Sequence, residues 1–402
     1  MWAKYKLSEL GAIVGGATPS TSVEKYYGGE IAWVTPKDLS SFSGRYIECG
    51  ERNITEEGLN SCSAQLLPAG SVLFSSRAPI GYVAIAKNPI ATNQGFKSLV
   101  PDTKKVDSLF MYYLLKYNKN RIEAMGSGTT FKEVSGATMK NIEVNLPPLA
   151  EQKRIAGILG ALDDKIELNR RINANLEEQA QALFKSWFMD FEPFRDNPFV
   201  DSELGKIPQG WKVAELGNVT KQQTEKVGQQ TTVKVLSPVT TGELVLSEEY
   251  FTKQVFSESI AKYIIVKPNQ FAYNPARINI GSIGRNTFGF DGCVSPVYVV
   301  FECEKGYHYF FDFFRKTDAF KKAVISRAIG GVRQTLGYKD FALIKVVYPP
   351  ENVVRKFNAI YINLLNSQNH HNLENKTLSA LRDTLLPKLM SSELSVESNY
   401  EL

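Results

Sequence analysis

The chain has 402 residues, which is more than one ordinary hydrophobic core holds, so its length predicts two to four domains. Its 43% hydrophobic and 22% charged residues are typical of a globular protein and exclude a disordered chain. With 47 Lys and Arg against 42 Asp and Glu, the formal net charge of +5 is too small to identify a partner by itself.

The scarcity of Cys and His argues against a metal centre. Cys49, Cys62, Cys293 and Cys303 form no CxxC pair, so we expect neither a zinc site nor a disulfide framework, and we interpret them as small buried thiols. Three His in the whole chain leave little material for a histidine-based catalytic or metal site. We therefore predict no bound metal.

The chain shows no sign of a membrane or secreted protein. The start, MWAKYKLSEL, lacks the apolar stretch of a secretion signal, and no run of about 18 apolar residues occurs. We therefore expect a cytoplasmic protein that does not contact a membrane.

An internal repeat sets the predicted domain boundaries. Along the chain, YKLSELG (5–11) matches WKVAELG (211–217), RAPIG (77–81) matches RINIG (277–281), and LPP (146–148) matches YPP (348–350). We predict a first module at 1–148, a helix and linker at 149–200, a second module at 201–348, and a helix and tail at 349–402. The expected fold class is α+β, with two mixed α/β modules separated by two long helices.

Each predicted helix begins at a Pro-Pro pair and carries apolar residues at heptad spacing, as in a coiled coil. The predicted seam consists of Ile155, Leu159, Leu162, Ile166, Asn169, Leu176, Leu183, Phe357, Tyr361, Leu364, His371, Leu378 and Leu385.

The middle of both predicted seams is polar, with Asn169 and Asn173 in the first helix and His371 and Asn375 in the second. Polar centres coincide if the helices pair antiparallel, and a buried polar layer fixes their register. We therefore expect an antiparallel pair that acts as a ruler between two modules related by a pseudo-two-fold axis. Two separate core or dimerisation helices are the alternative.

Two similar but non-identical modules at a fixed separation are suited to reading two different short sequences on one DNA duplex. The modules carry the positive charge, with 16 Lys and Arg against 13 Asp and Glu in 1–148, and 19 against 14 in 201–348. The halves match least at about 20–66 and 222–265. We expect base-reading residues partly there, because a scaffold can be shared while readout must differ.

Within the matched parts, three stretches contain side chains that could hold phosphate or read bases. They are SSRAPIG with TNQG facing NPARINIG with VSPV, the Gly loops GSGTTFKEV and GGVRQTL, and WVTPKDL. Ordinary turns and solvated lysines are the alternative interpretation of all three. The candidate DNA-binding residues are Lys37, Arg77, Asn93, Gln94, Thr129, Thr130, Lys132, Asn274, Arg277, Arg285, Ser295, Arg333 and Gln334.

We find no catalytic motif. The chain lacks the cofactor loop and the Asn/Asp-Pro-Pro-aromatic motif of an amino-methyltransferase, and it lacks a Walker loop for ATP. Asp163-Asp164-Lys165 resembles part of a nuclease motif, but we expect it on the solvent side of the seam. We therefore predict a chain that is not an enzyme by itself.

The linker SWFMDFEPFRDNPFVDSELGKIPQGWKVAELG (186–217), the segment LPPLAEQKRIAGIL and the tail LRDTLLPKLMSSEL (381–394) resemble the specificity subunit of type I restriction-modification systems. The resemblance covers essentially the whole chain. It implies two target-recognition domains that read a bipartite asymmetric DNA site. Helices at 148–188 and 350–389 would set the spacer and dock the modification subunits.

The same resemblance implies the partners. These are two modification subunits that bind S-adenosylmethionine and methylate adenine at N6, and restriction subunits driven by ATP and Mg²⁺, with no cofactor on this chain. Three alternatives remain open: the equivalent subunit of a type II-like system with a fused nuclease-methylase, a standalone methyltransferase or nuclease, and a scaffold that binds only proteins.

Overall fold

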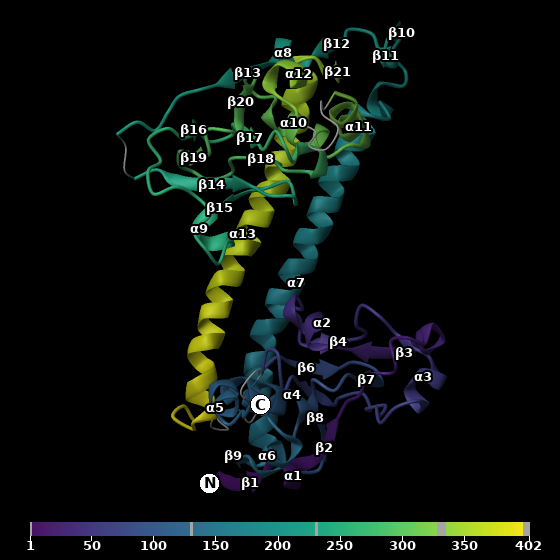
Figure 1. Ribbon diagram of the computed structural model, residues 1–402, viewed down its shortest axis with the longest axis vertical. Coiled ribbons are helices and arrows are strands. Elements are labelled where there is room, and N and C mark those ends of the chain that lie inside the picture. Colours follow the sequence, from purple (N-terminus) through teal and green to yellow (C-terminus); the bar gives the residue numbers. More distant parts are fainter. Residues whose placement is uncertain (1, 129–131, 230–231, 328–334, 397–402) are drawn as a thin grey trace, which may run out of the picture. The chain divides into compact units, whose positions relative to one another are not determined.

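The structure, a computed structural model, describes residues 2–128, 132–229, 232–327 and 335–396. Its contacts divide the chain into two compact units (Figure 1). Unit 1 comprises Met1–Ile172 and His370–Leu402, and unit 2 comprises Asn173–Asn369. Each unit holds one globular module and part of each of two long helices. Among the described residues, no helix is long and apolar enough to span a membrane.

The two long helices are α7 (Leu149–Phe188) and α13 (Glu351–Met390), each of 40 residues. Each helix begins at the residue that directly follows its Pro-Pro pair. Proline is well tolerated at this position because the first amide groups of a helix have no intrahelical acceptor. Glu151 and Glu351 lie in the first turns, where the helix dipole favours a negative charge.

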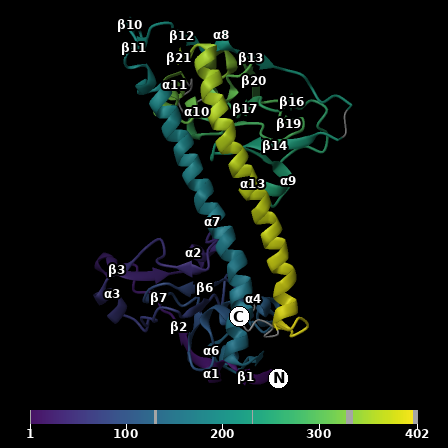
Figure 2. The same ribbon diagram turned by 180° about the vertical axis from the view of Figure 1, so that it is seen from behind.

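In unit 1, α13 packs antiparallel on α7 (Figures 1 and 2). Arg382 donates from Nη1 to Asp163 Oδ1 at 2.6 Å, and Asn169 donates from Nδ2 to Asn375 Oδ1 at 2.9 Å. Residue numbers therefore fall along α13 as they rise along α7. The end of α13 at Leu389 is buried in the same cluster as the start of α7.

In unit 2 the two helices are antiparallel as well. Asn173 donates to the carbonyl of Gln368 at 3.3 Å, and the ring centroids of Phe184 and Phe357 are 6.1 Å apart. The prediction of antiparallel helices is thus confirmed within each unit. Polar groups meet near the middle of both helices, as the sequence predicts, and Asn169 is fully buried there.

The thirteen residues predicted for the seam all lose solvent exposure to different degrees. Six are buried: Ile155, Leu159, Ile166, Asn169, Phe357 and Tyr361. Seven are half-buried: Leu162, Leu176, Leu183, Leu364, His371, Leu378 and Leu385.

The module of unit 1 contains a five-stranded sheet in the order β2-β8-β5-β6-β4, a parallel pair β3-β7 and an antiparallel pair β1-β9. The strands are β1 (Ala3–Lys6), β2 (Gly11–Gly15), β3 (Tyr27–Val34), β4 (Tyr46–Ile47), β5 (Val72–Phe74), β6 (Val83–Ala86), β7 (Ile90–Thr92), β8 (Lys97–Pro101) and β9 (Glu143–Leu146). The helices are α1 (Leu7–Leu10), η1 (Glu24–Tyr26), α2 (Pro36–Ser40), α3 (Glu56–Asn60), α4 (Ser108–Tyr117), α5 (Lys119–Ala124) and α6 (Gly136–Asn141).

The module of unit 2 contains two four-stranded sheets, β13-β20-β17-β18 and β15-β14-β19-β16, with the pairs β12-β21 and β10-β11. Its strands are β10 (Phe199–Ser202), β11 (Gly205–Pro208), β12 (Lys212–Glu215), β13 (Thr220–Gln223), β14 (Lys234–Pro238), β15 (Leu244–Leu246), β16 (Ile264–Val266), β17 (Phe271–Tyr273), β18 (Ile283–Arg285), β19 (Gly292–Val294), β20 (Val299–Cys303) and β21 (Lys345–Tyr348). Its helices are η2 (Glu192–Phe194), α8 (Leu216–Val219), α9 (Ser247–Tyr250), η3 (Ile278–Ile280), α10 (His308–Phe314), α11 (Asp318–Arg327) and α12 (Tyr338–Phe341).

The two modules repeat one strand topology, which confirms the predicted fold class with its internal repeat. In unit 1, β5 pairs antiparallel with β6 and β8, and β3 pairs in parallel with β7. In unit 2, β17 pairs antiparallel with β18 and β20, and β14 pairs in parallel with β19. The modules differ at α2, β4 and α3 on one side and at β15 and α9 on the other, within the segments whose sequences match least.

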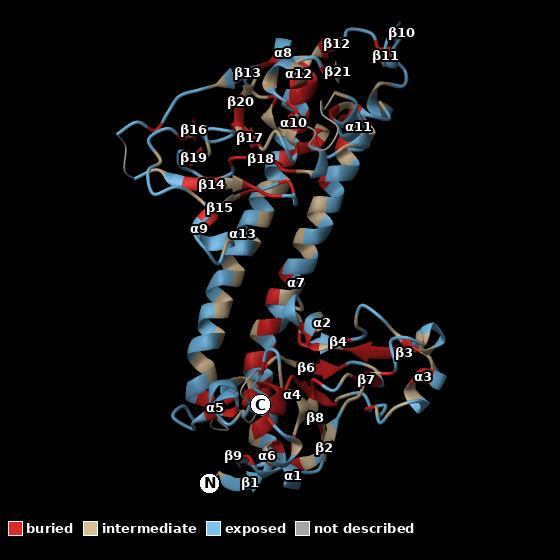
Figure 3. Cartoon of the chain, in the orientation of Figure 1, coloured by how far each residue is buried: buried red, intermediate tan, exposed pale blue. Residues whose placement is uncertain are grey.

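Each module packs its sheet against one apolar helix and against a face of the long helices (Figure 3). In unit 1 the helix is α4, in which Phe110 and Tyr113 are fully buried. In unit 2 it is α10, whose Phe311 packs edge-on against Phe271 and Phe301 of the sheet. Burial of aromatic rings at this scale accounts for much of the stability of each core.

The structure corrects two expectations from the sequence. Asp163 does not lie on the solvent side of the seam: it is 8% exposed and accepts from Tyr113 Oη at 2.6 Å. Helix α7 is covered by α4 as well as by α13, so a second face of it is buried. The thiols are not uniformly buried either, because Cys49 is exposed and only Cys293 is fully enclosed.

Candidate functional site

Three segments that are separate in the sequence of unit 1 meet at one end of its sheet. They are the turn from Ser75 to Gly81, the turn from Thr92 to Phe96, and the loop around Glu133, and we call them turn cluster 1. Ser76 donates its amide to Gly95 O at 2.7 Å and accepts at its own carbonyl from the amide of Val134 at 2.9 Å. The shared strand pairing of β5 and β8 brings the first two turns together.

Turn cluster 1 carries more positive than negative charge. Arg77 lies 3.7 Å and Lys97 3.3 Å from Glu133, so one carboxylate faces two cations. The side chain of Arg77 is 36% exposed, and Lys132 next to Glu133 is exposed. The positive charge of this cluster can attract a polyanion over a distance, and the guanidinium of Arg77 can donate directional hydrogen bonds.

The amide side chains of turn cluster 1 have different local roles. Asn93 Oδ1 accepts from the amide of Gly95 at 2.9 Å and so closes its own turn. Gln94 is exposed, and its Oε1 accepts from the hydroxyl of Thr18. A terminal amide on a solvent-exposed turn can pair with an adenine edge, provided that the turn holds it in place.

Lys37 lies beside the same cluster. It belongs to α2, whose Pro36 is next to Gly95, and the amide of Asn93 donates to Val34 O immediately before α2. The Nζ of Lys37 lies 2.7 Å from Glu51, with both side chains mostly exposed. Such a surface ion pair contributes little to stability.

Unit 2 builds a corresponding arrangement, which we call turn cluster 2. It consists of the turn from Asn274 to Ser282, the turn from Ser295 to Tyr298, and the chain at Leu336. Asn274 Oδ1 accepts from the amide of Ala276 at 3.0 Å, and Leu336 donates to Pro275 O at 3.0 Å. Strands β17 and β20 bring the first two turns to one end of their sheet, as β5 and β8 do in unit 1.

Arg277 is the exposed cation of turn cluster 2. Burial raises the pKa of Tyr298, and the charge of Arg277 and a hydrogen bond with the Asn274 side chain oppose that shift. Ser295 is half-buried, and its carbonyl accepts from the amide of Tyr298 at 2.9 Å. Among the described residues, Arg277 has no ion-pair partner.

Arg285 must be removed from the candidate set. It is 7% exposed, donates from Nε to Asp312 Oδ2 at 2.8 Å, and donates from Nη1 to Asn269 at 2.8 Å. Burial by itself would raise the pKa of Asp312, but Arg315 and Arg285 outweigh burial and hold that pKa below its ordinary value. Arg285 therefore stabilises the module interior and is unavailable to a ligand. The sequence does contain a signal for this role: Asp312 is the one carboxylate in the aromatic run HYFFDFF, and a buried carboxylate requires a cation.

Four other candidates, Thr129, Thr130, Arg333 and Gln334, lie outside the described residues. The remaining polar candidates fall into two groups by unit. Turn cluster 1 and its neighbour α2 hold Lys37, Arg77, Asn93, Gln94 and Lys132, and turn cluster 2 holds Asn274, Arg277 and Ser295.

His308, next to this buried network, predicts a pH dependence of unit 2. Burial, followed by repulsion from Arg285, lowers the pKa of His308 to about 4 from the ordinary 6.5. The folded unit thus favours the neutral imidazole, so stability is full above pH 6.5 and falls as the pH decreases toward 4. We expect unit 2 to lose no more than about 2 kcal/mol between pH 7 and pH 5.

Hydrogen exchange of unit 2 peptides at several pH values measures this loss. The variant His308→Gln should flatten the slope, while His370→Gln, at an exposed position of unit 1, should leave it unchanged. An identical slope in His308→Gln would contradict the assignment.

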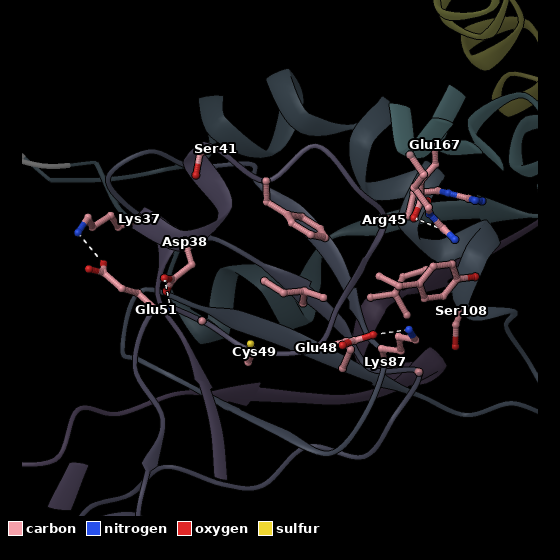
Figure 4. A pocket seen from close by; sticks show the side chains of 18 of the residues that line it. Lys37, Asp38, Ser41, Arg45, Glu48, Cys49, Glu51, Lys87, Ser108 and Glu167 are labelled. Carbon is pink, nitrogen blue, oxygen red and sulfur yellow. Dashed lines mark hydrogen bonds and ion pairs between the residues drawn. The ribbon is translucent and has the colours of Figure 1, made fainter. Parts of the chain in front are cut away.

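A cleft of about 1140 Å³ in unit 1 lies between β4, β6, the loop before β4, and α7 (Figure 4). Its cations are already paired: Lys37 with Glu51, Lys87 with Glu48, Arg45 with Asp164, and Arg171 with Glu167. Mixed and compensated charge does not suit a phosphate or a free anion. Among the described residues there is also no cluster of side chains that could hold a metal ion.

This cleft shows residues that sequence reasoning missed. Arg45 is 4% exposed and pairs with Asp164 of α7, and Arg170 of α7 donates to Ser43 O at 2.8 Å. Both contacts fasten the loop before β4, which belongs to the poorly matched segment, to the long helix. The sequence gives no signal for them because the partners are about 120 residues apart.

Comparisons with known proteins agree with this architecture. Residues 1–178 match the family described as the type I restriction modification DNA specificity domain. The type I restriction enzyme MjaIX specificity subunit of Methanocaldococcus jannaschii is 34% identical over 414 residues, covering 98% of this chain and 94% of the relative. The HindI specificity subunit of Haemophilus influenzae is 23% identical, with 98% and 99% covered. A crystal structure of a type I restriction-modification S subunit from M. genitalium has a TM-score of 0.58 at 18% identity, covering 97% of this chain and 96% of that one.

Proposed function

This chain belongs to the specificity subunits of type I restriction-modification systems, the subunits that recognise DNA, and we propose that each of its two modules reads one half of a bipartite, asymmetric DNA site. One observation carries the proposal: the two modules form equivalent turn clusters at the same end of equivalent sheets, but the side chains of the two clusters differ. Because the backbone scaffolds are alike, both modules can contact the DNA backbone in the same way. Because their side chains differ, they can read different base sequences.

The chemistry of the clusters fits this division. Turn cluster 1 offers Arg77, with Asn93 and Gln94 on the neighbouring turn, whereas turn cluster 2 offers Arg277 with Asn274 and Ser295. Arginine pairs bidentately with a guanine edge or a phosphate, and a terminal amide pairs with adenine. Two clusters of different composition imply that the recognised site is not a palindrome.

The long helices, in this proposal, set the spacer between the half-sites and dock two modification subunits. A continuous helix of 40 residues rises about 60 Å, and the buried polar group of Asn169 fixes its register against α13. The exposed faces of α7 and α13 remain available to partner helices.

We further propose that S-adenosylmethionine, ATP and Mg²⁺ belong to the partner subunits, and that this chain contributes no catalytic group to methylation at adenine N6 or to cleavage by the restriction subunits. The complex would act in the cytoplasm, on the duplex DNA of the cell and of invading phage.

Footprinting of the complex with its modification subunits on DNA tests the proposal. Two protected patches about one helical turn apart are the expected result. A complex that protects no DNA would reject it, and purified chain that methylates or cuts DNA alone would show an enzyme instead.

Single substitutions of the two arginines should separate the half-sites. Arg77→Ala should reduce discrimination against base changes in the first half-site by about 10- to 100-fold, and Arg277→Ala should do the same only in the second. The measurement is binding of the complex to cognate and singly altered duplexes at fixed salt. Lys104→Ala and Lys305→Ala are matched controls, because these exposed lysines follow the far ends of β8 and β20. Equal losses at both half-sites from either arginine variant would contradict the assignment.

A further inference from the structure

The two turn clusters also differ in the exposure of their aliphatic side chains. The matched motifs RAPIG and RINIG place Ile80 and Ile280 at the same position after the arginine. Ile80 is 4% exposed and belongs to the core of unit 1, but Ile280 is 53% exposed. In RINIG the preceding Ile278 takes the buried position instead, at 4% exposure, so the second isoleucine turns outward.

The neighbouring turn shows the same difference. At the repeat offset of 202, Gly95 of TNQGF faces Val297 of VSPVY. Gly95 is buried, and a Cβ there would lie 2.8 Å from Pro36, so unit 1 has no room for a side chain. Val297 is 70% exposed, the highest exposure among the large apolar side chains described.

Ile280 and Val297 lie on the two turns that form turn cluster 2, and Arg277 lies on the first of them. Ile280 ends η3, which follows Arg277 directly, and Val297 lies on the turn from Ser295 to Tyr298. The pairing of Tyr273 with Val299 brings the two turns to the same end of the four-stranded sheet β13-β20-β17-β18. Both exposed aliphatic side chains therefore lie at the end of the sheet that also carries the exposed Arg277 and the half-buried Asn274.

The chemistry of this surface matches a ligand that is anionic and polar and also carries small apolar groups. The two exposed branched aliphatic side chains offer apolar area, and its removal from water by a bound ligand is favourable. On a duplex, the apolar group that a protein reads in the major groove is the 5-methyl of thymine.

We propose that Val297 and Ile280 contact thymine 5-methyl groups in the half-site read by unit 2. This inference rests on the proposed function of the modules. It makes the two half-sites chemically different: unit 1 reads its half-site through polar groups, and unit 2 requires at least one thymine that it recognises by an apolar contact.

Replacement of thymine by uracil tests the inference, because uracil keeps every hydrogen bond and lacks only the methyl group. Once the half-sites are mapped by methylation, each thymine of the unit 2 half-site is replaced in turn, and binding of the complex with its modification subunits is measured at fixed salt. We expect at least one replacement to weaken binding about fourfold, the effect of losing one buried methyl contact.

Protein variants complete the cycle. Val297→Ser or Ile280→Ser should bind the thymine and uracil duplexes equally at that position, while Val297→Ile should keep the preference for thymine. Both positions are exposed, so folding should be unaffected. Uracil in the unit 1 half-site should give the same result with the unaltered protein and with all three variants.

The possible failures are distinct. A missing footprint at the second half-site would refute the proposed function itself. An intact footprint with no uracil sensitivity, or a half-site without thymine on either strand, would overturn this inference alone. Variants that lose a modification subunit but keep the thymine preference would show that the patch binds protein, which would also overturn it.

Discussion

Replacing Asp312 with Ala should destabilise unit 2 by about 3–5 kcal/mol. Asp312 lies between two buried guanidinium groups, with Oδ2 2.8 Å from Arg285 Nε and Oδ1 2.8 Å from Arg315 Nε. Arg285 and Arg315 are 7% and 8% exposed, so loss of the carboxylate leaves two charges that water cannot reach. An unpaired buried charge costs far more than a surface pair contributes.

Hydrogen exchange by mass spectrometry is the suitable measurement, because the two units need not unfold together. Peptides of unit 2 should exchange faster in Asp312→Ala, while those of unit 1 in the same molecule serve as an internal reference. Asp318→Ala is the matched control: Asp318 is 87% exposed and faces Lys321 at 3.4 Å, so its loss should have little effect. Similar exchange in the two variants would show that the buried network does not stabilise the module.

The direction of the pH effect follows from the lowered pKa of Asp312. Because the carboxylate is favoured in the folded state, its contribution is present above its ordinary pKa near 4 and is lost as the pH falls further. The effect of His308 begins at higher pH, near 6.5, so the two groups should act in separate windows.

Lengthening both long helices at the unit boundary should change the recognised spacer and leave both half-sites unchanged. Seven residues inserted after Ile172 and seven after Asn369 keep every contact within each unit, because the contacts of Asn169 lie in unit 1 and those of Asn173 in unit 2. Seven residues add about two turns and about 10 Å to each helix. If the helices set the spacer, the site should gain about three base pairs, since each base pair spans about 3.4 Å.

An insertion of four residues should lengthen the spacer by about two base pairs, with a rotation of about 40° that weakens binding. Seven residues inserted into α7 alone should impair the complex, because half of its seam then loses register with α13. As a control, the same insertion at the exposed turn after Thr241 should leave the spacer unchanged.

Methylation mapping of a host genome that expresses each variant gives the spacer and the half-sites directly. Altered half-sites with an unchanged spacer would contradict the role of the helices.

Residues at the turn clusters show how far local sequence patterns reach. The repeat places Arg77 opposite Arg277, and the structure puts both on exposed or half-exposed turns of equivalent sheets. The same repeat places Ile80 opposite Ile280, yet one is buried and the other exposed. In unit 2 the buried isoleucine is Ile278, two residues earlier, so Ile280 is left exposed. Matching the two motifs cannot show this difference.

Charged residues were the least predictable from the sequence. Arg285 and Asp163 look like surface residues in a one-dimensional pattern, but each is paired in the interior with a residue 27 or more positions away. Whether a charge is buried depends on whether a partner arrives from another element. The local sequence around a charged residue does not show whether such a partner is present.

The sequence by itself determined the two modules, the two long helices with their antiparallel pairing, and the family, because these depend on periodicity and repetition along the chain. Only the tertiary structure decided which charges are neutralised, which turns meet at the end of each sheet, and which aliphatic side chains face solvent. The physical reason is that desolvation and ion pairing depend on distances between segments far apart in the chain, which sheet pairing and helix packing set after the local elements have formed.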